Sequence, residues 1–464
     1  MSTCEFDLVV IGGGPAGTSG AIVSGLLGKS VALIEKAATI GGAGINTGTI
    51  PSKTLRETAL ALSGWRSRQL FGVDLSLRRE ATIAEFMHHQ NQVTGNERKR
   101  VQSRLHSTKT ETIIGAAAFV DPHTLRISNP GSEPREIRGR HILIASGSSP
   151  MRPPEFPFED NRVHDSSEIL DIQAIPKRLV VVGGGVIGCE YACTFAALGS
   201  QVTLIDGRGT LLPFLDAEIS RVLTDAMREN GIVIHFNEKV AKCDASHPGD
   251  VIVTLAGGAV IPCDGILVCA GRVKNTEELN LAAAGIATGE RGVICVDKNY
   301  RTNVPHIYAA GDVIGAPALA ATGMEQARIA VSHALDFSMK SDLAPLLPSG
   351  IYTIPEASMV GETEESLNAK GVRYIVGRAS YANNVRGKII GDHTGLLKLL
   401  FHADDMKLLG VHVVGELATE VVHIGLMAML ADGTVDVFSR ACFNYPTLGD
   451  LYKYAAYDAM MRSR

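Results

Sequence analysis

Glycines spaced as Gly-x-Gly-x-x-Gly occur twice in the sequence, and each set precedes an acidic residue that ends an apolar run. The first set is Gly12, Gly14 and Gly17 with Glu35, and the second is Gly183, Gly185 and Gly188 with Asp206. In such a motif the first glycine permits a tight turn, the second lets the backbone approach a pyrophosphate, and the third lets a helix pack closely on a strand. The acidic side chain can accept a hydrogen bond from a ribose hydroxyl. The spacing therefore predicts two dinucleotide sites.

Each motif needs a strand, a helix and a second strand to present its glycines. Residues 7–36 and 178–207 supply the same pattern twice, with every motif position shifted by 171 residues, as from Gly12 to Gly183. Both predict a βαβ unit whose helix begins at the glycines, where free N–H groups and the helix dipole favour a phosphate. Two such sites in one chain most simply hold a flavin dinucleotide and a nicotinamide coenzyme, with hydride passing between them.

Two further apolar segments fit the same plan. The stretch HILIASG, residues 141–147, and the stretch VPHIYAAGDVIG, residues 304–315, both read as buried strands that end in small residues. Each is also explained as a core strand followed by an ordinary turn. The acidic Asp312 after Gly311 is more specific, because an acid at the end of a strand can hold a ribityl hydroxyl of FAD.

Composition narrows the class of protein. The chain has 464 residues, a length that suits two to four globular domains. Of these residues 20% are charged and 45% are hydrophobic, and the net charge is -5, so the composition indicates neither disorder nor a nucleic-acid partner. We expect no membrane association, since no apolar run approaches the roughly 18 residues that a membrane helix needs. Eight cysteines without paired or metal-ligand spacing favour reduced thiols in a cytoplasmic protein and no metal site.

With these motifs in place, the sequence resembles the pyridine nucleotide–disulfide oxidoreductases, the family of glutathione reductase and dihydrolipoamide dehydrogenase. The resemblance also rests on Ile-Pro-Ser-Lys at 50–53, Ala-Gly-Arg at 270–272 and Ala-Gly-Asp at 310–312. It implies an α/β fold with two Rossmann-like dinucleotide-binding domains, for FAD and NAD(P), and a C-terminal α+β dimerisation domain. The implied order is FAD-binding residues 1–150, NAD(P)-binding residues 151–270, a return to the FAD domain over 271–345, and dimerisation residues 346–464.

The resemblance assigns roles to single residues. It places Lys53 beside the flavin, paired with Glu190, which would flank the nicotinamide. It assigns Glu35 to the adenosine ribose of FAD and Asp312 to the ribityl chain. Tyr445 would reach the flavin pocket of the other subunit in a homodimer or higher homo-oligomer, with an interface tyrosine as the alternative. Five further positions are expected to contact the bound dinucleotides: Lys36, Thr49, Gly147, Gly271 and Gly311.

The loop GGAGINTGTIPSK, residues 41–53, departs from the disulfide-reducing members of the family. Those members carry two cysteines where this chain has Gly44 and Thr49, and a histidine and a glutamate where it has Tyr445 and Asp450. Attack on a disulfide needs a thiolate, so this chemistry has no route through the loop. Hydride transfer between a nicotinamide and a flavin needs only stacking and orientation, so it stays possible.

Within the family, TGTIPSK and YPT most resemble the soluble pyridine nucleotide transhydrogenases, although these usually keep a cysteine at the position of Gly44. The resemblance implies ping-pong hydride transfer from NADPH to NAD+ through FAD. The alternatives are an NAD(P)H dehydrogenase of diaphorase type, which would reduce quinones or oxygen, and a catalytically silent flavoprotein.

Coenzyme preference stays open at this point. Asp206 favours NAD by bonding the ribose 2′-hydroxyl, whereas Arg208 can bind the 2′-phosphate of NADP bidentately. Together they would admit both coenzymes, while a solvated Arg208 would leave an NAD-selective site.

Overall fold

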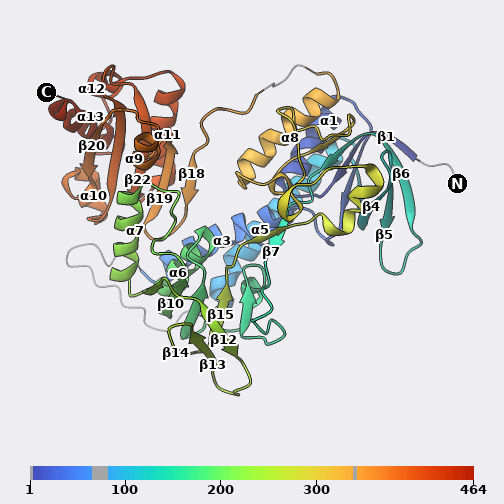
Figure 1. Cartoon of the computed structure of the whole chain (residues 1–464), viewed down its shortest axis with the longest axis horizontal. Coiled ribbons are helices and arrows are strands. Elements are labelled where there is room, and N and C mark those ends of the chain that lie inside the picture. The colour runs from blue at the N-terminus through green and yellow to red at the C-terminus, as the bar shows by residue number, and fades with distance from the viewer. Residues whose placement is uncertain (1–3, 65–81, 338–341, 464) are drawn as a thin grey trace. The chain divides into compact units, whose positions relative to one another are not determined.

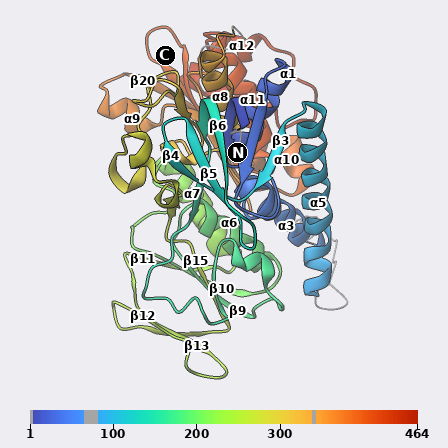
Figure 2. The same cartoon turned by 90° about the vertical axis from the view of Figure 1, so that its right-hand side faces the viewer.

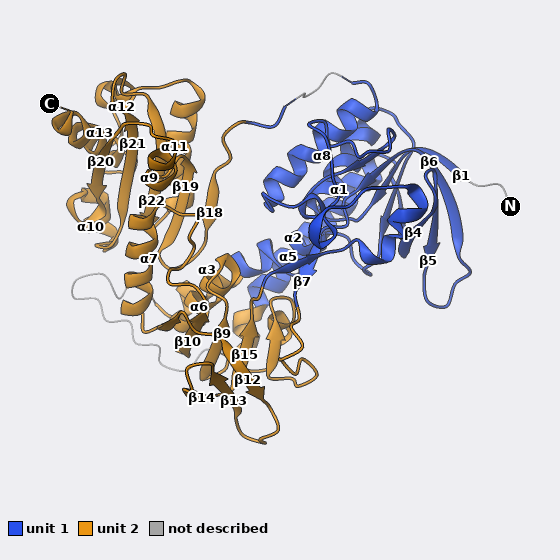
Figure 3. Cartoon of the chain, in the orientation of Figure 1, with its two compact units in different colours: residues 1–54, 88–151, 271–344 blue, residues 55–87, 152–270, 345–464 orange. Residues whose placement is uncertain are grey.

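The structure is a computed structural model, and it describes residues 4–64, 82–337 and 342–463. The chain divides into two compact units, which are coloured separately in Figure 3. Unit 1 comprises residues 1–54, 88–151 and 271–344, and unit 2 comprises residues 55–87, 152–270 and 345–464. Each unit has its own sheets and its own buried apolar clusters.

Unit 1 is built on a sheet with the strand order β3-β2-β1-β6-β5-β4, in which β17 also pairs with β6 (Figure 1). The strands are β1 (Cys4–Ile11), β2 (Val31–Glu35), β3 (Glu111–Ile114), β4 (Ala116–Asp121), β5 (Thr124–Ser128), β6 (Arg135–Ile144) and β17 (Ile307–Ala309). β1, β2, β3, β6 and β17 run parallel. β4 and β5 continue from β6 in antiparallel pairing, and these three strands are labelled in Figure 2. Parallel strands are covered on both faces, which explains the unbroken apolar run of β2 before Glu35.

The helices of unit 1 lie close to this sheet because small residues face it. Helix α1 (Pro15–Leu26) begins at a proline, whose fixed φ suits the first helical position. A Cβ at Gly20 would lie 2.6 Å from Leu143 of β6, so only glycine allows α1 to approach this closely. The other elements of this part are α2 (Gly42–Asn46), α8 (Ala320–Ala334), and the antiparallel pair β7 (Ser148–Pro150) and β16 (Arg272–Lys274). Helices α3 (Thr49–Leu62) and α5 (Ile83–Ser107) contribute residues to both units.

Unit 2 contains a second parallel sheet, in the order β11-β10-β9-β15-β8. Its strands are β8 (Val163–Asp165), β9 (Arg178–Val182), β10 (Gln201–Asp206), β11 (Val233–Phe236) and β15 (Gly265–Val268). Helix α6 (Val186–Ala197) follows β9, and α7 (Ala217–Glu229) follows β10. A small antiparallel sheet of β12 (Val240–Asp244), β13 (Val251–Leu255) and β14 (Val260–Cys263) completes this part.

The C-terminal part of unit 2 is an antiparallel sheet with helices. The strand order is β18-β19-β22-β21-β20. The strands are β18 (Ser349–Ile351), β19 (Glu356–Gly361), β20 (Tyr374–Ser380), β21 (Leu396–His402) and β22 (Leu408–Gly415). The helices are α9 (Glu364–Ala369), α10 (Val385–Ile390), α11 (Ala418–Leu430), α12 (Val435–Arg440) and α13 (Leu451–Arg462).

The predicted fold class is confirmed: two Rossmann-like βαβ arrangements are followed by a C-terminal α+β sheet. Residues 141–144 of the apolar stretch 141–147 form the end of β6, which stops at Ile144. The stretch 304–315 contains β17 followed by a short 3-10 helix over Asp312–Ile314. The four predicted domain ranges stay a prediction. Among the described residues, none of the helices combines the length and the apolar character that crossing a membrane requires.

Candidate active site

The first glycine loop follows β1 in unit 1. Gly12 has φ +104°, and a Cβ there would lie 2.3 Å from the carbonyl oxygen of Ala145. A Cβ at Gly17 would lie 1.9 Å from the carbonyl oxygen of Gly12, so α1 rests directly on the turn. At Gly14 the nearest atom to a Cβ would be the Cα of Gly42, at 3.8 Å. The loop is therefore closed on the side of the sheet and open at Gly14, where a pyrophosphate would approach the helix N-terminus.

The second glycine loop, in unit 2, repeats this geometry. Gly183 also has φ +104°, and a Cβ there would lie 2.4 Å from the carbonyl oxygen of Cys269. A Cβ at Gly188 would lie 1.9 Å from the carbonyl oxygen of Gly183, and a Cβ at Gly185 would meet nothing within 4 Å. The predicted strand, tight turn and helix are thus present in both copies, and each presents an open helix N-terminus.

The two acidic residues brace their own loops, a role that the sequence motif did not indicate. Glu35 Oε2 accepts a hydrogen bond of 2.7 Å from the N–H of Gly13, and its other oxygen accepts from Ala37 N at 2.8 Å. Asp206 Oδ2 accepts a bond of 2.5 Å from the N–H of Gly184. Each carboxylate therefore fixes the middle glycine of its loop, in addition to any ribose bond that it makes.

Asp206 is also paired with Arg208. The Nε and Nη2 atoms of Arg208 lie 2.9 and 2.7 Å from the two carboxylate oxygens, and the backbone N–H of Arg208 donates at 2.7 Å. Burial alone would raise the pKa of Asp206, but the hydrogen bonds from Arg208 and Gly184 outweigh it and hold the pKa below its ordinary value. The structure thus brings together the two residues whose relation the sequence left open, and the negative charge of Asp206 is compensated.

The residues expected around a ribityl chain lie beside the first loop. Gly311 has φ +80°, and its Cβ would lie 3.2 Å from that of Ala16, so the turn that carries Asp312 abuts the start of α1. Asp312 Oδ2 accepts a hydrogen bond of 2.6 Å from Ser148, whose hydroxyl oxygen accepts from Arg272 Nε at 2.8 Å. Sequence reasoning gave Arg272 no role, although it ends the Ala-Gly-Arg motif.

A buried hydroxyl without a hydrogen-bond partner indicates that a ligand can bind next to the first glycine loop. The hydroxyl of Ser146, which follows β6, is buried and has no hydrogen-bond partner among the described residues. Buried hydroxyls are rarely left unpaired. Ser146 also lies next to Gly12, since its Cα would be 3.1 Å from a Cβ at that position. The open Gly14, the orphaned hydroxyl and Asp312 together fit a dinucleotide such as FAD.

The loop of residues 41–53 forms α2 and opens α3. A Cβ at Gly44 would lie 2.5 Å from Cγ of Pro15, so the space of the missing first cysteine is filled by the start of α1. Thr49 begins α3 and its carbonyl accepts a bond from Ser52. Lys53 is half-buried, with Nζ 3.3 Å from the Ser52 hydroxyl.

The other expected catalytic residues lie in unit 2. Glu190 on α6 is buried, and its Oε1 accepts a hydrogen bond of 2.9 Å from the N–H of Tyr352. Its pairing with Lys53, a residue of unit 1, stays a prediction. Tyr445 follows α12 and is 69% exposed, which suits both the flavin-pocket role and the interface role predicted for it.

The remaining predicted contact residues have structural partners of their own. Lys36 forms an exposed ion pair with Glu278 at 2.5 Å. The carbonyl of Gly147 accepts from Asn275 N at 3.1 Å, and that of Gly271 accepts from Met151 N at 2.9 Å. Both glycines have positive φ, +72° and +114°, which favours glycine at these two turns.

Five of the described thiols offer no substitute for the missing loop cysteines: Cys189, Cys193, Cys243, Cys263 and Cys269. Burial raises the pKa of the Cys193 and Cys263 thiols to about 12 and that of Cys243 to about 11. Burial also holds the pKa of Cys189 and Cys269 far above the ordinary value. A thiol of such high pKa is not a nucleophile near neutral pH.

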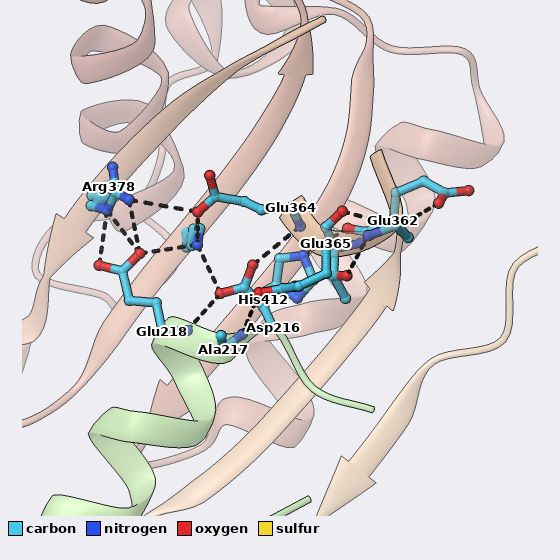
Figure 4. Close-up of polar contacts among 11 residues, drawn as sticks. Asp216, Ala217, Glu218, Glu362, Glu364, Glu365, Arg378 and His412 are labelled. Atoms are coloured by element: carbon cyan, nitrogen blue, oxygen red, sulfur yellow. Dashed lines mark hydrogen bonds and ion pairs between the residues drawn. The ribbon is translucent and has the colours of Figure 1, made fainter. Parts of the chain in front are cut away.

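Three carboxylates gather in unit 2, from Asp216, Glu218 and Glu364, in a geometry that could hold a metal ion. Figure 4 shows this cluster, which joins α7 to the C-terminal sheet. The buried Lys398 Nζ lies 2.7 Å from Asp216, 3.0 Å from Glu218 and in contact with Glu364. Burial would raise the pKa of Glu218, but Arg378 and Lys398 lower it to about 2. The ammonium already supplies the cation, so we interpret the cluster as a structural ion network.

Comparisons with known proteins cover nearly the whole chain. Residues 6–334 match the family model described as pyridine nucleotide-disulphide oxidoreductase, and residues 347–456 match its dimerisation domain. The chain is 45% identical to the soluble pyridine nucleotide transhydrogenase of Mycobacterium tuberculosis over 99% of this chain and 98% of that protein. It is 38% identical to the protein of the same name from Pseudomonas putida, over the full length of both.

A solved structure, the HOCl-induced flavoprotein disulfide reductase from Escherichia coli, matches with a TM-score of 0.87 at 29% identity. The match covers 96% of this chain and 99% of the reductase.

Proposed function

The chain belongs to the pyridine nucleotide-disulphide oxidoreductase family, and from that premise we propose that it is an FAD-dependent transhydrogenase, which moves hydride from NADPH to NAD+. The observation that carries the proposal is the presence of two glycine loops of one geometry in a chain whose redox loop has no thiol. Two dinucleotides can therefore be held, and disulfide chemistry has no route. The full-length similarity to transhydrogenases supports the same function.

The residues of unit 1 suit the binding of FAD. The N-terminus of α1 and the open Gly14 would receive the pyrophosphate, Glu35 would accept a hydrogen bond from the adenosine ribose, and Asp312 would hold the ribityl chain. Bound FAD supplies the flavin ring that takes up and returns hydride. Lys53 would place a positive charge beside the flavin as it gains negative charge, and Glu190 would pair with that lysine and flank the nicotinamide. In this proposal Gly44 and Thr49 add no redox group to the loop.

The second loop suits both coenzymes. Because Arg208 covers both oxygens of Asp206, the carboxylate repels a 2′-phosphate less than a free acid would. The same guanidinium, whose side chain is 48% exposed, can turn towards the 2′-phosphate of NADP(H) when that coenzyme binds. A site that accepts NAD(H) and NADP(H) in turn is what ping-pong exchange requires.

The proposal extends to the assembly and the location of the protein. The dimerisation-domain match and the exposed apolar side chains in that region support a homodimer. Those side chains are Met427, Leu430, Val437, Tyr445, Tyr454, Tyr457 and Met461. We place the protein in the cytoplasm, which fits the unpaired state of the cysteines that the structure describes.

An anaerobic two-step experiment tests the function. The protein with its bound FAD is mixed with NADPH until the yellow flavin absorbance bleaches, and NAD+ is then added. We expect the absorbance to return while NADH forms. Recovery with a quinone but not with NAD+ would replace the proposal with a diaphorase, and flavin that NADPH cannot bleach would leave a silent flavoprotein.

A further inference from the structure

The turn between β18 and β19, residues 352–355, forms hydrogen bonds with side chains from α3, from α6 and from the residue that follows α7. The hairpin closes with Ile351 paired to Ala357. The carbonyl of Ile354 accepts a bond of 2.9 Å from Asn230, just after α7, and a longer one of 3.8 Å from the Cys193 thiol on α6. The turn is thus fixed to the helices that follow the second glycine motif.

A buried arginine ties α3 to the same turn. The side chain of Arg56 is 3% exposed, and its Nε donates to the carbonyl of Thr353 at 3.0 Å. Its Nη1 lies 3.3 Å from Glu356 Oε1. The other oxygen of Glu356 accepts from the backbone N–H and the hydroxyl of Thr419, at 3.1 and 2.8 Å. Burying a guanidinium is costly unless it is paired and hydrogen-bonded, so this arrangement holds α3 at one defined place.

Two of the three expected catalytic residues, Lys53 and Glu190, lie on helices that are tied to this turn. Arg56 lies three residues after Lys53 on α3, which is about one helical turn. Glu190 is held directly, because its carboxylate accepts the N–H of Tyr352. One hairpin turn therefore holds the helix that carries Lys53 and the side chain of Glu190.

We infer that the β18–β19 turn positions Lys53 and Glu190 for hydride transfer, with Arg56 and Glu356 as positioning residues. This rests on the proposed function for the roles of Lys53 and Glu190. Arg56 acts through α3 and need not touch FAD or a coenzyme. A shift of about 1 Å in a reacting group can cost roughly 100-fold in rate, so the effect of losing the anchor should be measurable.

The experiment compares three variants of the full-length protein with bound FAD: Arg56→Lys, Arg56→Met, and the double variant Arg56→Met with Glu356→Gln. The double variant leaves no unpaired buried charge and keeps an acceptor for Thr419. We expect it to be bleached by NADPH about 10- to 100-fold more slowly, with an unchanged KM for NADPH and a shifted flavin absorption spectrum. Arg56→Lys should recover part of the rate, since it keeps the charge without the planar fork.

The control is Arg378→Met, which breaks another ion pair of unit 2, at 2.8 Å to Glu218 in Figure 4. It should lower the melting temperature while leaving the spectrum and the bleaching rate unchanged. A double Arg56 and Glu356 variant with the wild-type rate and spectrum would overturn the inference, as would an equal loss of rate in Arg378→Met. If NADPH fails to bleach even the wild-type protein, the proposed function fails, and the flavin spectra of the Arg56 variants still test the anchor.

Discussion

The two glycine loops have nearly the same backbone conformation, but the acidic side chains that contact them have different hydrogen-bond partners. The glycine that caps each helix has φ and ψ of -74° and -175° in the first loop and -79° and -177° in the second. Yet Glu35 accepts only backbone N–H groups among the residues described, whereas Asp206 also pairs with Arg208. Steric constraints on the glycines thus fix the backbone that would receive a pyrophosphate. The charge next to the ribose depends instead on the residues that follow the second strand of each unit, such as Arg208 after Asp206.

The difference suits the two dinucleotides proposed for these loops. A resident FAD needs one permanent arrangement, and the first loop presents one acid held by the backbone. A coenzyme site that takes NAD(H) and NADP(H) in turn needs a negative charge that can be either covered or exposed. The carboxylate of Asp206 has this property, because Arg208 can cover it. Four experiments test whether the two loops serve different dinucleotides.

The largest effect is expected from alanine at the third glycine of either loop. In both Gly17→Ala and Gly188→Ala, the new Cβ would lie 1.9 Å from a carbonyl oxygen, so the helix must move. Overpacking of this kind costs about 3 kcal/mol, or roughly 100-fold in an equilibrium constant. Gly17→Ala should lose FAD on purification, while Gly188→Ala should keep FAD and bleach with NADPH roughly 100-fold more slowly.

Gly95→Ala serves as the control for these two variants, because a Cβ there meets no atom within 4 Å. FAD content and bleaching by NADPH should both match the wild type. Loss of FAD in Gly188→Ala to the extent seen in Gly17→Ala would show that the loops do not serve separate dinucleotides.

The second largest effect is expected from neutralising the acidic residue of each loop, Glu35 or Asp206. Glu35→Gln weakens the bonds to Gly13 and Ala37, and hydrogen bonds to a charged group contribute about 1.5–3 kcal/mol. We expect FAD affinity to fall about 10-fold, measured by fluorescence titration of the apoprotein. Asp206→Asn should leave FAD affinity unchanged and shift the ratio of kcat/KM values towards NADPH. Equal changes in FAD affinity in the two variants would contradict the assignment of loops.

Replacing Arg208 should change the KM for NADPH much more than the KM for NADH. Arg208→Gln leaves the Asp206 carboxylate uncompensated next to the position of the 2′-phosphate. We expect KM for NADPH to rise about 10-fold with little change for NADH, as for the loss of one charged contact. Arg221→Gln, at an exposed position of α7, is the matched control. An equal rise in KM for both coenzymes would mean that Arg208 only shapes the loop.

The smallest effect is on acid stability. The pKa of Asp206 is below its ordinary value in the folded protein, so the stabilisation from this carboxylate is complete above the ordinary carboxyl range. It is lost as the pH falls through the lowered pKa. Arg208→Gln removes a cause of the lowering, so acid unfolding should begin at a higher pH than in the wild type. Circular dichroism against pH measures this, and an unchanged midpoint would show that the pair contributes little.

Much of the fold followed from local rules that the sequence displays. Gly12 and Gly183 occupy the turns that their motifs predict, and α1 and α6 begin at the glycines of those motifs, as predicted. The same rules missed contacts between residues far apart in the chain. Ser148 and Asp312, 164 positions apart, and Arg56 and Thr353, 297 positions apart, carry no shared sequence signal. Arg272 could have been found, since it ends a motif that the sequence singles out.

The two βαβ units, the family and the absence of loop thiols could all be read from the amino-acid sequence, because glycine sterics, apolar periodicity and residue identity are local properties. Three features became visible only in the folded chain: Asp206 pairs with Arg208, Pro15 fills the space beside Gly44, and one hairpin turn holds both α3 and Glu190. These depend on which surfaces meet when the chain folds. The contacts join positions whose separation in the sequence gives no sign of their distance in space.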